Sequence, residues 1–319
     1  MQRASGEVQA SGGLRRHAPP STIPRMEHTK VGSVELCYEL LGEPGDPCLL
    51  LVNGLGGQLI AWDDGFLEHL QEQGFRVLRF DNRDAGLSTE FSDGPAFDLK
   101  AGMAGDKSAA AYTLDEMADD AAGLLDVLGI PGVHVVGVSM GGMIAQTMAI
   151  RHPSKVLTLC SIMSTTGSRN LAPSTPEAQR VLMTRPPEDR SSFIEKELET
   201  YKVIGSPDFG LPDDRVREGA AAAFDRSFRP DGVARQLMAV MVSGDRTLAL
   251  NDLDVPTLVI HGEDDPLIRA SGGKATAEAI PGSRLLIIPG MGHDLPPATW
   301  SQIVAAIVDN ARRAGERVR

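Results

Sequence analysis

The segment Gly137-Val138-Ser139-Met140-Gly141 joins a run of β-branched residues to a segment with helical spacing. Residues 133–138 predict a buried strand, and residues 143–150 have the apolar pattern of an amphipathic helix. A serine at such a junction, with glycine two positions before and after it, is typical of the tight turn called a nucleophile elbow. This turn exposes the serine hydroxyl and directs a helix N-terminus, which favours negative charge, toward the group attacked. Ser139 is therefore the candidate nucleophile, and the alternative is an ordinary glycine-rich turn.

Strand and helix signals alternate along most of the chain. Short apolar or alternating runs predict strands at residues 34–41, 48–52, 76–80, 133–138 and 156–162. Helical patterns occupy residues 62–73 and 113–128, and a capping box of Thr113 and Glu116 opens the second of them. Such a βαβ succession indicates a mostly parallel sheet with helices on both faces. Residues 92–111 lack clear periodicity, and we expect a loop there.

The alternation breaks between residues 168 and 252. This segment is helical in character, has several proline-marked breaks and contains no good strand candidate. Strands resume at 258–261 and 284–288, with helices near 271–280 and 297–313. We expect an α/β domain of about eight strands, in which a helical cap at residues 168–252 interrupts a core of residues 26–167 and 253–319. Apolar cap residues that could line a pocket are Met183, Phe193, Phe224, Phe228 and Met238.

Residues 1–25 differ from the rest of the chain. They contain four arginines, one glutamate and almost no apolar periodicity. They also lack the continuous apolar stretch of a secretory signal. We expect a disordered tail, because too little apolar surface is present to offset the entropy of ordering it.

Charge and cysteine content argue against several classes of partner. The net charge of −12 does not favour binding to nucleic acid, which requires clustered lysine and arginine. No apolar run approaches the roughly 18 residues that a membrane-spanning helix needs, so we expect no transmembrane segment. The odd number of well-separated cysteines, Cys37, Cys48 and Cys160, indicates buried thiols in a reducing compartment. A cytoplasmic location follows as an expectation.

A serine nucleophile needs a base, and a histidine base works best when a carboxylate orients it. Among seven histidines, His293 follows strand 284–288 in a glycine-rich loop. That loop lies at the carboxyl edge of the predicted sheet, where catalytic groups gather in open α/β folds. The acid is expected between the serine and the histidine. The loop after strand 258–261 offers Glu263, Asp264 and Asp265, and their adjacency alone does not choose among them.

These segments together resemble the α/β-hydrolase fold superfamily over roughly residues 27 to 314. The resemblance rests on five segments in order: Asn53-Gly54-Leu55-Gly56, Asp81-Asn82-Arg83-Asp84-Ala85-Gly86-Leu87-Ser88, Gly137-Val138-Ser139-Met140-Gly141-Gly142, His261-Gly262-Glu263-Asp264-Asp265-Pro266 and Gly292-His293-Asp294. Within the superfamily the second and last segments look most like bacterial carboxylic-ester hydrolases of the aclacinomycin methylesterase type.

The resemblance implies a role for each site residue. Ser139 would be the nucleophile, His293 the base and Asp265 the orienting acid. The oxyanion hole, which binds the negative oxygen formed during ester cleavage, would use the backbone N–H groups of Met140 and Leu55. The family often has histidine where this chain has Asn53, which puts the local bonding of that loop in doubt.

The implied function is a serine esterase that takes a small-molecule ester and uses no cofactor. Thioesterase, lipid esterase, lactonase, C–C hydrolase and perhydrolase chemistry use the same scaffold, and a ligand sensor with little turnover is a rival of another class. The three carboxylates at 263–265 lack the additional ligands of a metal site, so we expect no metal. We interpret Asp81, Arg83 and Asp84 as a structural ion-pair cluster at a turn.

Overall fold

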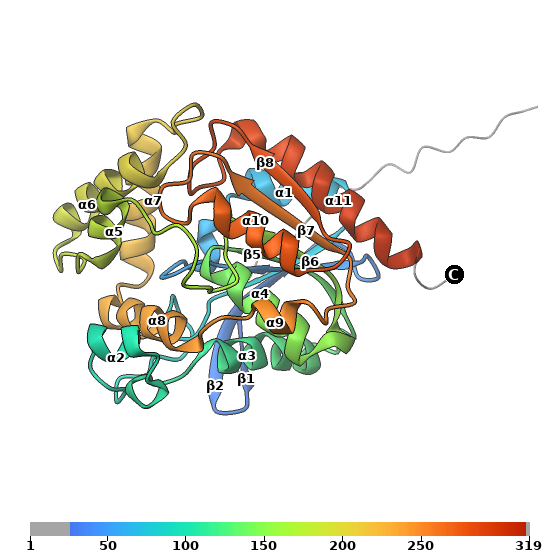
Figure 1. Cartoon of the computed structure of the whole chain (residues 1–319), viewed down its shortest axis with the longest axis horizontal. Helices are drawn as coiled ribbons and strands as arrows, with labels where there is room; N and C mark the ends of the chain where they lie inside the picture. The colour runs from blue at the N-terminus through green and yellow to red at the C-terminus, as the bar shows by residue number, and fades with distance from the viewer. Residues whose placement is uncertain (1–25, 317–319) are drawn as a thin grey trace, which may run out of the picture.

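Eight strands form one sheet in the computed structural model, which describes residues 26–316 (Figure 1). Their spatial order is β1 (Glu27–Val31), β2 (Val34–Leu41), β4 (Arg76–Phe80), β3 (Cys48–Val52), β5 (Val133–Val138), β6 (Val156–Ile162), β7 (Thr257–Gly262) and β8 (Arg284–Ile288). Neighbours from β4 to β8 pair in parallel, whereas β1–β2 and β2–β4 are antiparallel. The predicted mostly parallel, eight-stranded α/β fold is confirmed. The prediction of a tail at residues 1–25 lies outside the described residues.

Both faces of the sheet are apolar, as strand β3 illustrates. Successive side chains of a strand point to opposite faces, and all five residues of β3 are buried. Leu49 and Leu51 belong to the cluster formed with α1 (Asp64–Glu72) and α11 (Trp300–Glu316). Leu50 and Val52 belong to the cluster on the other face, with α3 (Leu114–Val127), α4 (Met140–Arg151) and the end of α10 (Ala270–Ala279). Burying one leucine is worth about 1.5–3 kcal/mol, so each continuous apolar strand strongly favours burial between two helical layers.

The predicted capping box at the start of α3 is present. Thr113 and Glu116 each bond to the backbone of the other, and this satisfies two N–H groups that the helix leaves free. The loop expected at residues 92–111 is wrong in part, because α2 (Leu99–Ala104) and the short 3₁₀ helix η2 (Lys107–Ala109) lie within it. Gly102 of α2 packs against two methionines of α8 (Pro230–Ser243), so a tertiary contact stabilises a helix with weak local signals.

Five helices separate β6 from β7: α5 (Pro176–Met183), α6 (Arg190–Ile204), α7 (Asp213–Arg226), α8 (Pro230–Ser243) and α9 (Thr247–Leu250). Proline occupies a first-turn position in α5 and α8, where its missing N–H costs nothing. Phe193, Phe224 and Phe228 pack together in tilted and edge-to-face contacts, with ring centroids 4.8–5.6 Å apart, which joins α6 to the end of α7. Helices α5 to α8 gather with α2 beside one end of the layered core (Figure 1).

Candidate active site

Ser139 sits in a strained turn between β5 and α4. Its φ of 55° and ψ of −120° are unusual for a residue with a side chain, and such strain costs about 1–3 kcal/mol. A Cβ on Gly137 would lie 2.1 Å from the carbonyl oxygen of Gly141, and one on Gly141 would lie 2.1 Å from that of Val52. Neither contact is possible, so only glycine fits at both flanking positions. The geometry of a nucleophile elbow is therefore present.

The imidazole of His293 bridges Ser139 and Asp265. Nε2 of His293 lies 2.9 Å from Oγ of Ser139, and Nδ1 lies 2.7 Å from Oδ2 of Asp265. The three residues come from the turn after β5, the loop after β7 and the loop after β8. Parallel strands bring these loops to one edge of the sheet. Asp265 and His293, which lie 126 and 154 positions after Ser139 in the sequence, thus form one hydrogen-bonded chain with it.

The carboxylate of Asp265 is fully buried but well supplied with donors. Oδ1 accepts hydrogen bonds from the backbone N–H groups of Leu267 and Ile268, at 2.8 and 2.9 Å. Burial alone raises the pKa of Asp265, but the charge of His293 and hydrogen bonds from His261 and His293 outweigh it and lower the pKa to about 2. Asp265 is consequently ionised at neutral pH.

The neighbouring acidic residue has a different contact. Oδ2 of Asp264 accepts from the N–H of Gly290 at 3.0 Å, in the loop that precedes His293. His261 is fully buried, and its Nε2 lies 2.7 Å from the carbonyl oxygen of Ile268. Of the candidate acids, only Asp265 contacts the His293 ring in the described contacts.

The loop after β3, residues 53–57, approaches Ser139; we call it the β3 loop. A Cβ on Gly54 would lie 3.2 Å from Cβ of Ser139. The N–H of Gly57 donates to the carbonyl oxygen of Gly54 at 3.1 Å, which closes a turn around Leu55 and Gly56. Asn53 is anchored through its carbonyl oxygen, which accepts from the side chain of Asn82 at 3.2 Å. The β3 loop, which contains Leu55, thus lies against the nucleophile, and Met140 follows Ser139 as the first residue of α4.

Contacts from α6 hold the His293 loop, and sequence reasoning missed them. The N–H of His293 donates to the carbonyl oxygen of Ile204 at 2.7 Å, and that of Gly292 donates to Oγ of Ser206 at 2.9 Å. The Ser206 hydroxyl in turn donates to Asp294. Burial raises the pKa of Asp294, against the effect of this hydrogen bond. No local pattern links residues almost ninety positions apart.

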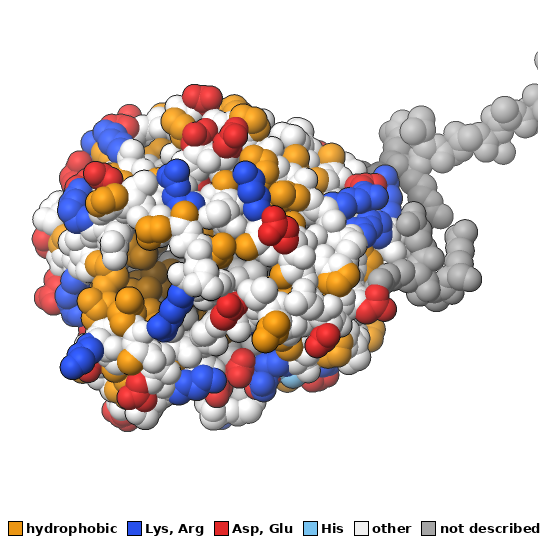
Figure 2. Space-filling view, viewed as in Figure 1, with side chains coloured by type: hydrophobic (Ala, Val, Ile, Leu, Met, Phe, Trp, Pro, Cys, Tyr) orange, Lys and Arg blue, Asp and Glu red, His pale blue; other side chains and the backbone are white. Residues whose placement is uncertain are grey.

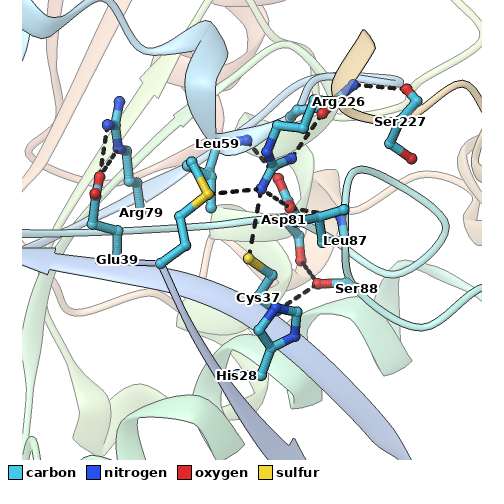
Figure 3. A network of polar contacts seen from close by, with 12 residues as sticks. His28, Cys37, Glu39, Leu59, Arg79, Asp81, Leu87, Ser88, Arg226 and Ser227 are labelled. Atoms are coloured by element: carbon cyan, nitrogen blue, oxygen red, sulfur yellow. Dashed lines mark hydrogen bonds and ion pairs between the residues drawn. The ribbon is translucent and has the colours of Figure 1, made fainter. Parts of the chain in front are cut away.

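Asp81 and Asp84 form buried ion pairs with the helices between β6 and β7. Asp81 contacts Arg226 of α7 at 2.7 Å (Figure 3), and Asp84 contacts Arg235 of α8 through two 2.8 Å bonds. Arg83 instead pairs with an aspartate of α3. The structural interpretation of the turn is confirmed, but the partners of the two aspartates come from distant helices rather than from Arg83.

Several other groups have plain structural roles. All three cysteines are free and buried, and burial raises the pKa of Cys37 and of Cys48 to about 11 and also raises that of Cys160. Within residues 26–316 no cluster of three or more potential ligands is arranged to hold a metal ion. No helix in that range is both long and apolar enough to span a bilayer.

Hydrophobic side chains surround a hollow between helices α5–α7 and helix α8 (Figure 2). Among the large apolar side chains exposed on α5, on α2 and just before α2 are Phe97, Leu99, Met103 and Met183. A cavity of about 360 Å³ lies between residues 92–97 and α8, with Met238 in its lining. Part of the apolar surface in this region is therefore exposed rather than packed.

Comparison with known proteins places the chain in a family. The family model described as "alpha/beta hydrolase fold" matches residues 47–202, and one described as "TAP-like protein" matches residues 239–310. Rhodomycin D methylesterase from Streptomyces peucetius is 30% identical over 306 residues, which cover 88% of this chain and 96% of that protein. A bifunctional esterase/perhydrolase from Acinetobacter calcoaceticus is 27% identical, over 84% of this chain and 92% of its own.

A solved structure shows the same architecture over nearly the whole chain. The crystal structure of a hydrolase from Pseudomonas aeruginosa superimposes with a TM-score of 0.67 at 26% identity, covering 91% of this chain and 97% of that one. The two family models between them include the Ser139 turn and the His293 loop. The chain belongs to the α/β-hydrolase fold family, among relatives named as ester hydrolases.

Proposed function

We propose that this protein hydrolyses carboxylic esters through an acyl-enzyme on Ser139, with His293 as base and Asp265 as its orienting acid. One observation carries the proposal: the ring of His293 contacts Oγ of Ser139 at 2.9 Å and the carboxylate of Asp265 at 2.7 Å. These distances fall within the hydrogen-bond reach expected of a nucleophile, a base and an orienting group.

In the first half of the reaction, Oγ of Ser139 bonds to the ester carbon while its proton passes to Nε2 of His293. The carbonyl electrons move to the oxygen, which receives hydrogen bonds from the N–H groups of Leu55 and Met140. When the carbonyl re-forms, the ester C–O bond breaks and His293 gives its proton to the departing alcohol. Asp265 stabilises the imidazolium and holds the tautomer with Nδ1 protonated.

Water completes the cycle. Its oxygen attacks the acyl carbon as His293 removes a proton, and collapse of the second tetrahedral intermediate breaks the bond to Ser139. The proton on His293 returns to Oγ, and the carboxylic acid leaves. Every proton moves among Ser139, His293, the substrate and water, so the scheme requires no cofactor or metal.

The inserted helices act as a cap in this proposal, with boundaries at residues 168 and 252. Support comes from the contacts of Ile204 and Ser206 with the His293 loop and from the apolar hollow beside α8. The apolar surroundings favour an ester with a hydrophobic body. Methyl esters are the first class to assay, because the related Streptomyces proteins are named as methylesterases. We also propose a cytoplasmic location, which the free buried thiols support.

Turnover of p-nitrophenyl esters of increasing acyl length tests the proposal, followed by methyl esters and matched thioesters. We expect many turnovers per protein molecule, and loss of activity in Ser139→Ala. A ligand sensor would instead release about one equivalent of product and stop. Retention of full activity in Ser139→Ala would contradict the mechanism.

A further inference from the structure

We propose that Gln236 of α8 is a positioning residue for catalysis, which anchors the β3 loop in the place from which the N–H of Leu55 reaches the oxyanion. This inference rests on the proposed function. It makes part of the inserted helical segment a support for the chemistry itself, beyond its covering of the site.

The β3 loop contains a turn whose central peptide could point in two directions. Gly57 N–H donates to Gly54 C=O, so Leu55 and Gly56 are the two central residues of this turn. Gly56 has a φ of +68°, which a type II turn requires at its third residue. Type I and type II turns differ mainly by a flip of the peptide between the two central residues. The orientation of the Leu55–Gly56 peptide therefore decides which turn forms.

Gln236 bonds directly to that peptide. Its Oε1 accepts from the N–H of Gly56 at 2.8 Å, and its Nε2 donates to the carbonyl oxygen of Arg83 at 2.7 Å. Both partners are backbone groups, one a donor and one an acceptor, so the orientation of the amide is determined. The side chain is fully buried. An N–H that loses its acceptor inside the protein destabilises the arrangement that leaves it unpaired, so Gln236 favours the observed position of this peptide.

The second partner, the carbonyl of Arg83, connects Gln236 to a fixed part of the core. Arg83 lies in the turn after β4, the strand that pairs with β3, and its guanidinium is held by two bonds to Asp120 of α3. Space around Gly56 is tight, because a Cβ on it would lie 3.0 Å from a methyl carbon of Val233, which is also on α8. Gln236 thus spans two adjacent loops at the carboxyl edge of the sheet.

The hydrogen bond between Gly54 and Gly57, which both turn types share, sets the direction of the Leu55 N–H. Gln236 acts on the place of that turn relative to Ser139, because it anchors the next peptide. In a trans peptide the C=O and N–H point in opposite directions, and no cis peptide occurs in residues 26–316. The carbonyl of Gly54 points toward Gly57, so the N–H of Leu55 points away from Gly57. Removing one oxyanion donor costs about 10²–10³ in kcat. Without Gln236 the turn can shift relative to Ser139 while its own hydrogen bond stays intact. This misplaces the Leu55 donor without deleting it, and we expect a smaller effect.

Gln236→Leu tests the role, because leucine has a similar volume and makes neither bond. With p-nitrophenyl acetate, and with active sites counted by fluorophosphonate titration, kcat should fall about 10- to 100-fold while KM changes less than about threefold. Affinity for a trifluoromethyl ketone, whose adduct on serine carries an oxyanion, should fall by the same factor as kcat/KM. Affinity for the matching methyl ketone should stay within about twofold, because it forms little of that adduct.

Gln146→Leu is the matched control. Gln146 is a fully buried glutamine of α4 whose side chain also makes two hydrogen bonds, with Ser161 and Arg246. The Gln146→Leu substitution should lower Tm and leave kcat per titrated site within about threefold of wild type, because the oxyanion donors are untouched. Gly56→Ala approaches the same peptide from the loop side and should reproduce the kinetic signature even if Gln236→Leu fails to fold.

Wild-type kcat and ketone affinity in a folded Gln236→Leu protein would overturn the inference. Equal kcat losses in Gln146→Leu would also overturn it, since they would indicate general destabilisation. If Gln236→Leu does not fold, wild-type kinetics in Gly56→Ala would be the refuting result. Failure of the proposed function is a separate outcome: in that case Ser139→Ala would keep its activity whatever the Gln236 variants do.

Discussion

Asp265→Asn should disable catalysis while changing the shape of the site very little. Asparagine has nearly the same volume, and its amide oxygen can still accept from the N–H groups of Leu267 and Ile268, now 2.8 and 2.9 Å from the carboxylate. Its NH₂ group would then face Nδ1 of His293. A donor at that position favours the tautomer with Nδ1 unprotonated and Nε2 protonated, in which Nε2 cannot accept the proton of Ser139.

The magnitude follows from the geometry. Two effects are lost together, the correct tautomer and the stabilisation of the imidazolium by an ionised, buried carboxylate at 2.7 Å. The corresponding change in a serine protease costs about 10⁴ in kcat. That factor corresponds to about 5 kcal/mol of transition-state stabilisation. KM should change little, because Asp265 has no exposed surface with which to touch the substrate.

Steady-state hydrolysis of p-nitrophenyl acetate, with circular dichroism to verify folding, provides the assay. Asp264→Asn is the control, because asparagine can still accept the hydrogen bond from Gly290 N–H, which Asp264 accepts at 3.0 Å. We expect it to cost less than about tenfold in kcat, as it removes no transition-state contact. If Asp264→Asn were the more damaging change, the reasoning about the tautomer of His293 would be wrong.

Three further predictions concern stability. Asp84→Ala should lower the free energy of unfolding by about 3–5 kcal/mol in urea titrations, because Arg235 and the Tyr112 hydroxyl lose their buried partner. Only the more exposed Glu90, 3.7 Å from Arg235, then remains as a charge partner. A loss below about 1 kcal/mol would contradict this. Gly141→Ala should abolish folding or activity, since its Cβ would lie 2.1 Å from a carbonyl oxygen. Gly219→Ala is the control, because its Cβ would meet open space. It should raise Tm, by an amount that corresponds to up to about 1 kcal/mol of added stability. The pKa of Asp265 is about 2 in the folded protein, below the ordinary value of about 3.9, so its ionised form adds stability above pH 4 that disappears as pH falls toward 2. Relative to Asp265→Asn, wild type should lose about 2 kcal/mol over that interval, and a constant difference would refute the linkage.

Strands with strong local signals could be predicted from the sequence. Residues 48–52, 76–80, 156–162 and 284–288 match β3, β4, β6 and β8 at both ends, because each is an apolar run bounded by turn residues. Strand β1 was not predicted: its sequence, Glu-His-Thr-Lys-Val, is mostly exposed at the edge of the sheet and has no apolar pattern. Its pairing with β2 is tertiary information that a local pattern does not contain.

The residues of the candidate site also divide into those that local patterns located and those that they did not. Ser139 and His293 could be located because an elbow pattern and a loop at a strand end are local features. Nothing in the residues themselves distinguished Asp265 from its two acidic neighbours, and only family resemblance selected it. The contacts of Gln236 with Gly56 and of Ser206 with Gly292 link residues 180 and 86 positions apart. Such contacts depend on how the inserted helices dock, which no spacing rule predicts.

The central claim is that Ser139 becomes acylated, and covalent labelling tests it most directly. The protein should be treated with a fluorophosphonate, digested and mapped by mass spectrometry. The account predicts one adduct, on Ser139, at a rate that falls at least about 10³-fold in His293→Ala because the base is gone. Ser139→Ala should show neither label nor turnover. An adduct on another residue that abolishes activity, or a Ser139→Ala protein that still hydrolyses esters at the wild-type rate, would contradict the account.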